Sequence, residues 1–361
     1  LRCYRKRKHF LNFPRVLLAA LHNGLDTESG ETFFPGIGSL PDFEDFSRCM
    51  AAWEKQVRAY AEAGIAIDAA IDLVLMEEVP DLLCSAFTDD CLMRGRTIHE
   101  GGSKYDFVSG LQVGIANLGD SLAAINKFVF IEKSIGAAEL MSAMRDDYTS
   151  PQGERIRARL INEGPKYGND DNEVDLILAE AYGYYIDEIE KHRTIREGRG
   201  PIGCRYYAGT SSISGNVPAG SVVPATPDGR RAGVPLAEGA SPSPGSDRNG
   251  PTAVFKSVAK LPTVKILGGV LLNQKFNPDI FSQEPTREKL GSLIRAFFSG
   301  LKGWHVQYNV VSRDTLLAAQ RNPQSYRDLV VRVAGYSAFF TGLSPQVQNN
   351  IIARTEQQFH G

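Results

Sequence analysis

The sequence predicts an α/β fold. Apolar residues recur at helical spacing in several segments, and short apolar runs typical of strands stand between them. Residues 105–114 predict a strand that leads into a helix, and residues 306–310 predict a strand that follows the helical pattern of residues 286–300. Helices that alternate with short strands in this way are typical of α/β architectures.

The first part of the chain predicts two helices. Residues 13–22 predict a short helix, and Gly24 is expected to cap its C-terminus because glycine readily adopts left-handed backbone angles. Residues 42–78 predict one long helical region. The side chains expected to form its buried stripe are Tyr60, Gly64, Ile67, Ile71 and Val74.

Three more helices are predicted in the middle of the chain. Residues 120–131 and a segment that starts near Ala137 show helical patterns, and residues 173–191 predict an amphipathic helix. The pair Asp170 and Asp171 is interpreted as the solvated start of that helix rather than as metal ligands, because acidic residues suit helix N-termini. The inward side chains are expected to be Val174, Ile177, Leu178, Ala181 and Tyr185.

Residues 198–252 are rich in Gly, Pro and Ser and show few helical periods. They suit a flexible linker or an ordered, irregular scaffold around an active site. Interspersed apolar residues such as Val223 and Leu236 favour the scaffold, since long irregular segments inside compact proteins tend to be functional. Arg230 and Arg231 stand in a turn-like stretch and are expected to tie loops together rather than bind substrate.

Three helices are predicted after this segment, over residues 286–300, 315–320 and 325–330. One face of the first is expected to carry Leu290, Leu293, Ile294, Phe297 and Phe298. The strand predicted at residues 306–310 lies between the first and second of these helices.

The composition excludes several classes of protein. The 361 residues carry a net charge of -2, which gives no sign of a nucleic-acid-binding patch or of a surface for anionic membranes. No apolar run has the length of a membrane span, and no signal peptide is visible at Leu1. The five cysteines form no C-x-x-C pair, so reduced thiols and a cytoplasmic location are expected.

The most informative motif stands near the C-terminus, where residues 332–336 read Arg-Val-Ala-Gly-Tyr. Alone, such a pentapeptide is usually a turn. Three further blocks accompany it: residues 343–350 (Leu-Ser-Pro-Gln-Val-Gln-Asn-Asn), residues 303–312 (Gly-Trp-His-Val-Gln-Tyr-Asn-Val-Val-Ser) and residues 226–236, which are followed by Ser-Pro-Ser-Pro-Gly and Asp-Arg-Asn-Gly-Pro-Thr-Ala. Taken in their order along the chain, these blocks resemble those of the glycyl radical enzymes related to pyruvate formate-lyase.

The resemblance implies the fold and the central residue. It implies the C-terminal part of a ten-stranded α/β barrel of the glycyl radical enzyme type, with the barrel part in residues 1–240 and the glycine radical domain in residues 241–361. Gly335 would store an unpaired electron on its Cα. Glycine suits this role because a Cα without a Cβ can flatten, and because the chain can form a tight loop there.

The resemblance also implies the chemistry and the partners. No cofactor would be bound; an iron–sulfur activating enzyme that uses S-adenosylmethionine would install the radical. The blocks look closest to the diol dehydratase and choline lyase branch, which implies radical C–O, C–N or C–S cleavage of a small polar substrate. Radical decarboxylases and succinate-adding enzymes share many of these blocks and stay open as alternatives. A homodimer is compatible with the family.

One expected feature does not match. Most members of the family carry a Gly-Cys-x-Glu loop whose cysteine becomes a thiyl radical, and no cysteine here is followed two places later by glutamate. Cys3 and Cys204 are interpreted as structural, and His305 as a satisfied core histidine. The chain is therefore expected to be the C-terminal half of such an enzyme. A non-catalytic spare radical subunit and a truncated remnant are the other hypotheses.

Overall fold

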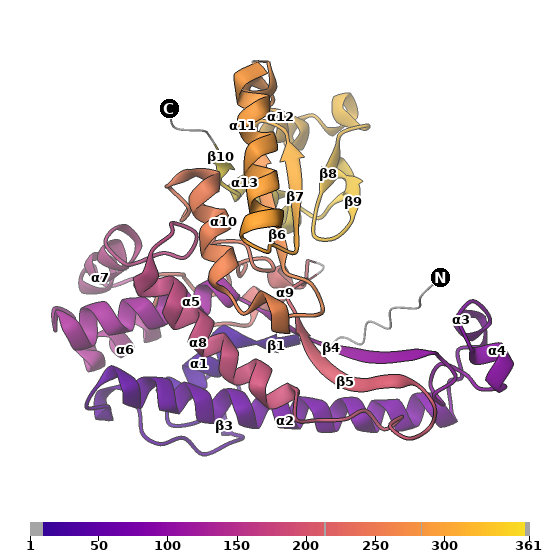
Figure 1. Ribbon diagram of the computed structural model, residues 1–361. Coiled ribbons are helices and arrows are strands. Elements are labelled where there is room, and N and C mark those ends of the chain that lie inside the picture. Colours follow the sequence, from indigo (N-terminus) through magenta and orange to yellow (C-terminus); the bar gives the residue numbers. More distant parts are fainter. Residues whose placement is uncertain (1–9, 213, 283, 358–361) are drawn as a thin grey trace.

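The computed structural model describes residues 10–212, 214–282 and 284–357. Figure 1 shows two lobes: a large, mainly helical lobe (residues 10–266) and a small lobe (residues 271–357) that stands on it. The large lobe contains the three-stranded parallel sheet β1-β4-β5, and the small lobe contains the three-stranded parallel sheet β10-β6-β7. The mixed α/β prediction is confirmed, whereas the described strands do not show a closed barrel.

The large lobe begins with the elements from strand β1 to helix α9. In chain order they are β1 (Phe10–Asn12), α1 (Phe13–Leu21), β2 (Leu25–Asp26), β3 (Glu31–Thr32), η1 (Leu40–Asp42), α2 (Phe46–Glu77), α3 (Leu82–Ala86), α4 (Cys91–Arg94), β4 (Tyr105–Val113), α5 (Ile115–Ala124), the π-helix η2 (Ile125–Ile131), α6 (Ala137–Arg145), α7 (Pro151–Asn162), α8 (Asn172–Ile189), β5 (Ile202–Gly209) and α9 (Asn216–Ser221).

The remaining elements complete the large lobe, with α10 and η3, and build the small lobe. They are α10 (Gly250–Lys260), η3 (Thr263–Lys265), β6 (Leu271–Phe276), η4 (Pro278–Phe281), α11 (Glu284–Arg295), the π-helix η5 (Ala296–Gly300), β7 (His305–Val310), α12 (Arg313–Arg321), η6 (Pro323–Tyr326), β8 (Val330–Arg332), β9 (Ser337–Phe339), η7 (Phe340–Gly342), α13 (Pro345–Ala353) and β10 (Glu356–Gln357). Strands β8 and β9 form an antiparallel hairpin.

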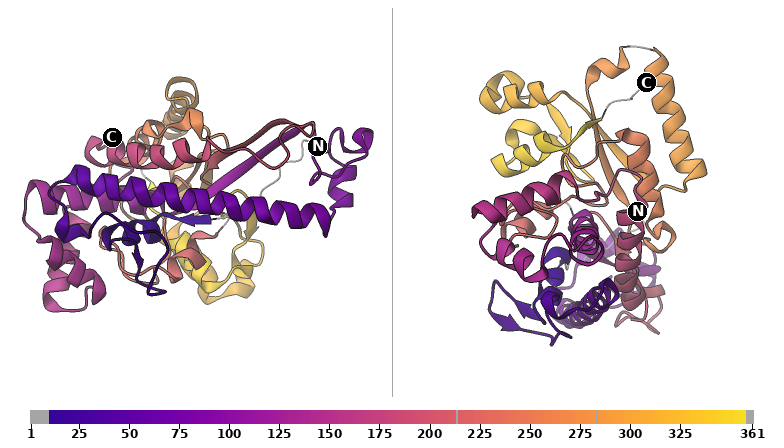
Figure 2. Two further views of the ribbon diagram at one scale, coloured as in Figure 1. Left: turned by 90° about the horizontal axis from the view of Figure 1, so that it is seen from below. Right: turned by 90° about the vertical axis from the view of Figure 1, so that its left-hand side faces the viewer.

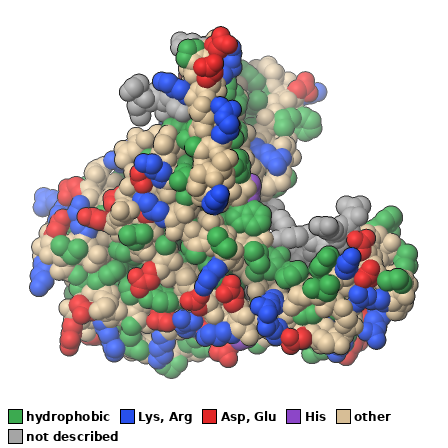
Figure 3. Space-filling view, viewed as in Figure 1, with side chains coloured by type: hydrophobic (Ala, Val, Ile, Leu, Met, Phe, Trp, Pro, Cys, Tyr) green, Lys and Arg blue, Asp and Glu red, His purple; other side chains and the backbone are tan. Residues whose placement is uncertain are grey.

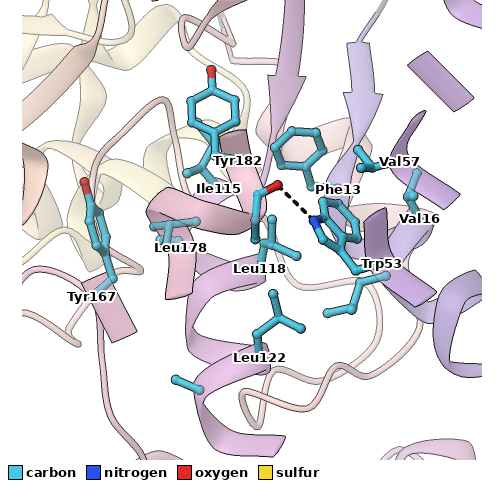
Figure 4. Close-up of a cluster of buried hydrophobic side chains, with 14 of the residues drawn as sticks. Phe13, Val16, Trp53, Val57, Ile115, Leu118, Leu122, Tyr167, Leu178 and Tyr182 are labelled. Carbon is cyan, nitrogen blue, oxygen red and sulfur yellow. Dashed lines mark hydrogen bonds between the residues drawn. The ribbon is translucent and has the colours of Figure 1, made fainter. Parts of the chain in front are cut away.

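The core of the large lobe lies where α1, α2, α5 and α8 meet (Figure 4). Phe13 packs edge-on against Trp53, with ring centroids 5.4 Å apart. The indole nitrogen of Trp53 donates a hydrogen bond of 2.9 Å to the carbonyl of Ala181, which satisfies its polar atom inside the core. These contacts fix α1, α2 and α8 against one another.

Several predicted elements are confirmed. Helix α1 occupies almost the predicted residues, the strand β4 leads directly into α5, and α8 buries Val174, Leu178, Ala181 and Tyr185 as expected, with Ile177 half-buried. The helix predicted at residues 120–131 starts earlier, at Ile115.

The cap of α1 differs from the prediction. Asn23, with φ 55°, takes the left-handed position after the helix, and the amide of Gly24 donates 2.7 Å to the carbonyl of Ala19. Gly24 also has a positive φ of 88°, and a Cβ there would lie 2.1 Å from the carbonyl oxygen of Phe34. Gly24 is therefore required by the closing turn and by the neighbouring backbone, one place beyond the left-handed Asn23.

The predicted buried stripe of α2 is wrong in its second half. The helix starts at Phe46, and Ile67, Ile71 and Val74 are exposed, whereas Asp68 and Asp72 are buried. Figures 1 and 2 show this half of α2 running beneath β4 and β5. The face toward those strands carries the acids because Arg196, which is fully buried, forms ion pairs with Asp72 (2.8 Å) and with Asp106 of β4 (2.7 Å).

Two predictions in the small lobe need correction. The helix predicted at residues 325–330 is a short 3-10 turn that ends at Tyr326, and Val330 already belongs to β8. The helix predicted at residues 286–300 forms as α11 and η5, but Phe298 is exposed, and its ring lies edge-on against the buried Phe297. Phe297 also stacks on Phe255 of α10, with ring centroids 4.1 Å apart.

The far end of α2, helices α3 and α4, and the adjoining ends of β4 and β5 form an arm. Its exposed hydrophobic side chains include Ile67, Ile71, Val74, Leu82, Leu83, Phe87, Leu92, Met93, Phe107 and Ile202. Figure 3 shows hydrophobic side chains on the part of this arm that faces the viewer. No helix among the described residues is long and apolar enough to cross a membrane.

Candidate active site

Gly335 lies in the tight turn between β8 and β9. The amide of Val333 donates 2.9 Å to the carbonyl of Tyr336, which closes the turn. Gly335 has φ 81°, a left-handed conformation that costs other residues about 1–2 kcal/mol. A Cβ at Gly335 would meet only the hydroxyl of Ser211, at 3.6 Å, so the backbone angle and not a lack of space makes glycine the suitable residue.

Strand β7 holds this turn from one side. The side-chain oxygen of Gln307 accepts 3.2 Å from the amide of Gly335 and 2.7 Å from Nε of Arg332. Two residues further on, Asn309 exchanges two hydrogen bonds of 2.8 Å with the backbone of Arg332. Alternate residues of a strand point to the same face, so β7 presents both amides to the turn. Both residues lie in the block 303–312, but their contacts could not be assigned from the sequence.

Arg354 holds the turn from the other side. Its Nη2 donates 2.8 Å to the carbonyl of Val333, and its Nη1 donates 3.3 Å to the carbonyl of Arg332. Arg354 is the C-cap residue of α13, so the end of that helix is tied to the chain just before Gly335. Burial lowers the pKa of the Arg354 guanidinium, and the negative charge of Glu238 opposes that shift.

Glu238 is a buried acid from the irregular segment of the large lobe. It accepts hydrogen bonds from the hydroxyl of Ser212 (3.1 Å) and from the amide of Asn273. Burial raises the pKa of Glu238 to about 7, while the charge of Arg354 and these hydrogen bonds lower it. No motif in the sequence marks Glu238; the available signal is one acid in an otherwise uncharged stretch, residues 232–246.

The large lobe contacts the turn through the segment after β5. The hydroxyl of Ser214 lies 3.1 Å from the hydroxyl of Tyr336, and the hydroxyl of Ser211 faces Gly335. Gly335 itself is exposed, although Val333 and Ala334 before it are buried. The turn is therefore fixed on one side by both lobes and is open on the other.

The burial of residues 198–252 supports the prediction that they form an ordered scaffold. Most of their described residues are buried or half-buried.

The cysteines lie apart from this arrangement or outside the described residues. Cys3 lies outside the described residues. Cys204 is buried in β5, at an irregularity in its pairing with β4, and its thiol donates 3.5 Å to the carbonyl of Pro201. Burial raises the pKa of the Cys204 thiol, which makes it a poor thiolate. Cys84 and Cys91 belong to the arm, and burial raises the pKa of Cys49 in α2 to about 12.

The structure also places the polar residues that the sequence singled out. Asp171 caps α8 by accepting from the amide of Glu173 (2.9 Å), and Asp170 pairs with Lys256 and Lys260, so this pair is a helix start as predicted. Arg230 donates to the carbonyls of Gly220, Val223, Pro224 and Val234, and Arg231 pairs with Glu154. Both arginines tie loops together. His305 is half-buried in β7 beside Gly269.

Comparison with known proteins assigns the chain to a family. Residues 3–220 match the family model described as pyruvate formate lyase-like, and residues 236–341 match the family model described as glycine radical. The second match contains the turn around Gly335. The chain therefore belongs to the pyruvate formate lyase-like glycyl radical enzymes, on their dehydratase branch.

Individual relatives show what the chain is similar to. It is 57% identical over 349 residues to the probable dehydratase YbiW of Escherichia coli (strain K12), covering 96% of this chain and 43% of that protein. It is 36% identical to the trans-4-hydroxy-L-proline dehydratase of Clostridioides difficile, covering 97% of this chain and 43% of that protein.

The fold is shared with a solved dehydratase. The glycerol-bound B12-independent glycerol dehydratase from Clostridium butyricum superposes with a TM-score of 0.89 at 39% identity, covering 97% of this chain and 43% of that chain. The chain thus spans less than half the length of the relatives it matches.

Proposed function

We propose that Gly335 stores the radical of a dehydratase that removes water from a small polar substrate by C–O cleavage. The turn around Gly335 carries this proposal: it combines the left-handed glycine with an amide held by Gln307 and a preceding carbonyl held by Arg354. The names of the relatives, which include dehydratases of hydroxyproline and glycerol, favour C–O cleavage. C–S cleavage is the second candidate, because the isethionate sulfite-lyase of Desulfovibrio desulfuricans is 36% identical.

The residues present fit radical storage. An activating enzyme that uses S-adenosylmethionine would take one hydrogen atom from the Cα of Gly335, and the stored radical would then supply hydrogen-atom abstraction. For that role the turn must stay in place while its Cα changes geometry. Gln307 and Arg354 provide this restraint, because they hold the backbone groups on both sides of Ala334. The open side of Gly335 leaves its Cα accessible to an activating enzyme.

The reactive cysteine and the acid–base glutamate of the family are not supplied by a Gly-Cys-x-Glu loop in this chain. We propose that both belong to the part of the family fold that these 361 residues do not span, and that this part completes the barrel. The exposed hydrophobic side chains of the arm support the idea, since large apolar patches mark surfaces that another element covers. We further propose a cytoplasmic location, a homodimer, and a boundary between barrel and radical domains at residues 240 and 241.

The experiment uses anaerobic activation of the purified chain by the activating enzyme of a related dehydratase. Electron paramagnetic resonance is expected to show an organic radical in the natural chain. The same signal is expected in Gly342→Ala, a matched control in the same lobe where a Cβ has free space and φ is not positive. Gly335→Ala is expected to show no signal.

Exposure to air then tests the position of the radical. Oxygen is expected to cut the activated chain at Gly335, so that mass spectrometry finds the loss of residues 336–361. A radical signal that survives in Gly335→Ala would reject the site. Failure of the natural chain to form any radical, while the related dehydratase forms one in the same mixture, would reject radical storage by this chain.

A further inference from the structure

A cavity of about 530 Å³ lies between the two lobes and contains no residue of the turn 333–336. Its walls come from α5, α7 and the loops 228–235 and 243–248 of the large lobe, and from α13 of the small lobe. The residues that line it are Asn117, Asp120, Arg157, Ile161, Lys166, Asp228, Gly229, Arg230, Arg231, Val234, Pro235, Ser243, Pro244, Gly245, Ser246, Arg248, Gln346, Asn349, Asn350 and Ala353. Cavities of this volume suit small ligands.

Four cations line the cavity without an ion pair among the described residues: Arg157, Lys166, Arg230 and Arg248. Arg230 already donates to four backbone carbonyls, which leaves Arg157, Lys166 and Arg248. Within the part of the chain that the structure describes, Arg157 uses only Nε, which donates 2.9 Å to the carbonyl of Gly229, and Lys166 donates 2.9 Å to the carbonyl of Asp228. The terminal guanidinium nitrogens of Arg157 and the whole head group of Arg248 therefore remain available for an anion.

The two acids of the cavity are already engaged. Asp228 accepts hydrogen bonds from Thr226, Asn117 and the amide of Arg230, and Asp120 accepts from the amide of Tyr167 (2.8 Å) and from Ser243 (3.3 Å). Both acids are buried. Burial also raises the pKa of Asp120 to about 7, which reduces its negative charge near neutral pH. The cavity thus presents more free positive than free negative charge.

Part of the remaining wall is apolar. Ile161, Val234, Pro235, Pro244 and Ala353 supply hydrocarbon surface between the charged groups. A ligand that satisfies both features carries an anionic group on an apolar body. An inorganic ion would contact only the charged side chains and would leave the apolar surface uncovered.

The cavity is connected to the radical turn through α13. Ala353 lines the cavity, and the next residue, Arg354, donates to the carbonyls of Val333 and Arg332. A smaller adjoining cavity shares Pro244 and Asn350 with the first and is lined by Arg354 and Glu238. A molecule bound between α13 and the large lobe would contact the helix that holds the turn.

We propose that this cavity binds a small organic anion, with a phosphate or carboxylate near Arg157, Lys166 and Arg248, and that the bound anion holds the small lobe against the large lobe. The proposal does not depend on radical storage at Gly335, because binding is measured on the inactive chain.

The test is calorimetric titration of the chain with phenyl phosphate and with benzoate at low salt. Binding of either is expected, and their relative affinity identifies the preferred head group. Inorganic phosphate, which lacks the apolar body, and benzyl alcohol, which lacks the charge, are expected to bind at least tenfold more weakly. Added salt is expected to weaken binding, because the cations of the rim are partly exposed.

The variant Arg248→Glu reverses the charge of an exposed side chain, so the chain is expected to fold normally. It is expected to weaken anion binding about tenfold. Arg155→Glu is the matched control, because Arg155 is exposed on α7 and lines no part of the cavity. Equal weakening in both variants, equal binding of benzyl alcohol, or no binding by the natural chain would each overturn the proposal.

Hydrogen exchange tests whether the bound anion holds the two lobes together. Exchange of the α13 amides is expected to slow when phenyl phosphate binds, and unchanged exchange would reject the link between the lobes.

Discussion

Gln307 and Gly335 are joined by a hydrogen bond of 3.2 Å, in which the side-chain oxygen of Gln307 accepts from the glycine amide. The same oxygen accepts 2.7 Å from Nε of Arg332. One acceptor on β7 therefore fixes both the glycine and the charged residue three places before it. The turn gains its position from tertiary contacts rather than from its own short hairpin.

Gln307→Leu should destabilise the small lobe and loosen the turn. The change removes the acceptor of a charged donor and of an amide, which costs about 1–3 kcal/mol in the free energy of unfolding. Urea unfolding measures this loss, and hydrogen exchange should show faster exchange at the Gly335 amide. Gln324→Leu is the control, since Gln324 accepts 2.7 Å from Arg327 but both are exposed. Its expected effect is within about 0.5 kcal/mol, and equal losses in the two variants would contradict the assigned role.

Gly335→Ala should remain folded but lose about 1–2 kcal/mol in the free energy of unfolding. The cause is the left-handed backbone angle, because the added Cβ meets only one atom at an ordinary contact distance. Gly342→Ala should be neutral or stabilise the chain by up to about 1 kcal/mol, since alanine restricts the unfolded chain at a compatible position. Urea denaturation of both variants measures the difference. An equal response at the two glycines would mean that the turn adopts another backbone conformation in solution.

Glu238 should make the chain less stable as the pH rises from about 5.5 to 7.5. Its pKa in the folded chain is about 7, above the ordinary value of 4.5, so the folded state holds a proton that the unfolded state has released in this range. The contribution of Glu238 to the free energy of unfolding is fully present below pH 4.5, and it is lost as the pH rises through 7.

The comparison of natural chain and Glu238→Gln isolates this effect from the other titrating groups. Buried Asp120 and Asp247 change stability in the same direction, while His22, whose pKa burial lowers, acts in the opposite direction. Between pH 5.5 and 7.5, the natural chain should lose about 1–2 kcal/mol more than Glu238→Gln. Parallel stability curves for the two proteins would show that Glu238 titrates normally.

Arg196→Leu should strongly destabilise the arm, by about 3–5 kcal/mol. The substitution leaves Asp72 and Asp106 buried without their common cation, which is far more costly than losing an exposed ion pair. Arg193→Leu is the control, because Arg193 pairs with Glu197 at the surface, and its expected loss is below about 1 kcal/mol. Thermal and urea unfolding measure both. A small effect of Arg196→Leu would mean that water reaches the two acids.

The sequence predicted those features that are determined by residues close together in the chain. Residues 332–336 indicated the glycine turn, and helical periodicity predicted α1 and α8 because their apolar side chains face the core. The second half of α2 could not be predicted in the same way. Its buried face is set by Arg196, a residue far along the chain, so the apolar pattern of Ile67, Ile71 and Val74 indicated the wrong face.

The candidate site was predictable only at its centre. Gly335 is visible in a motif, but the residues that hold it come from β7, from the end of α13 and from the irregular segment around Glu238. Gln307 and Arg354 look like ordinary polar residues in sequence. Their role exists only after β7, α13 and the irregular segment have packed around the turn.

The open side of Gly335 would affect the lifetime of a stored radical rather than the stability of the fold. Its backbone is anchored by Gln307 and Arg354, yet the glycine itself is exposed. The lifetime of an electron stored there would depend on how often dissolved oxygen and other quenchers collide with that surface, and not on how tightly the turn is folded. Any segment or partner that covers this side would lengthen the lifetime without needing to add stability.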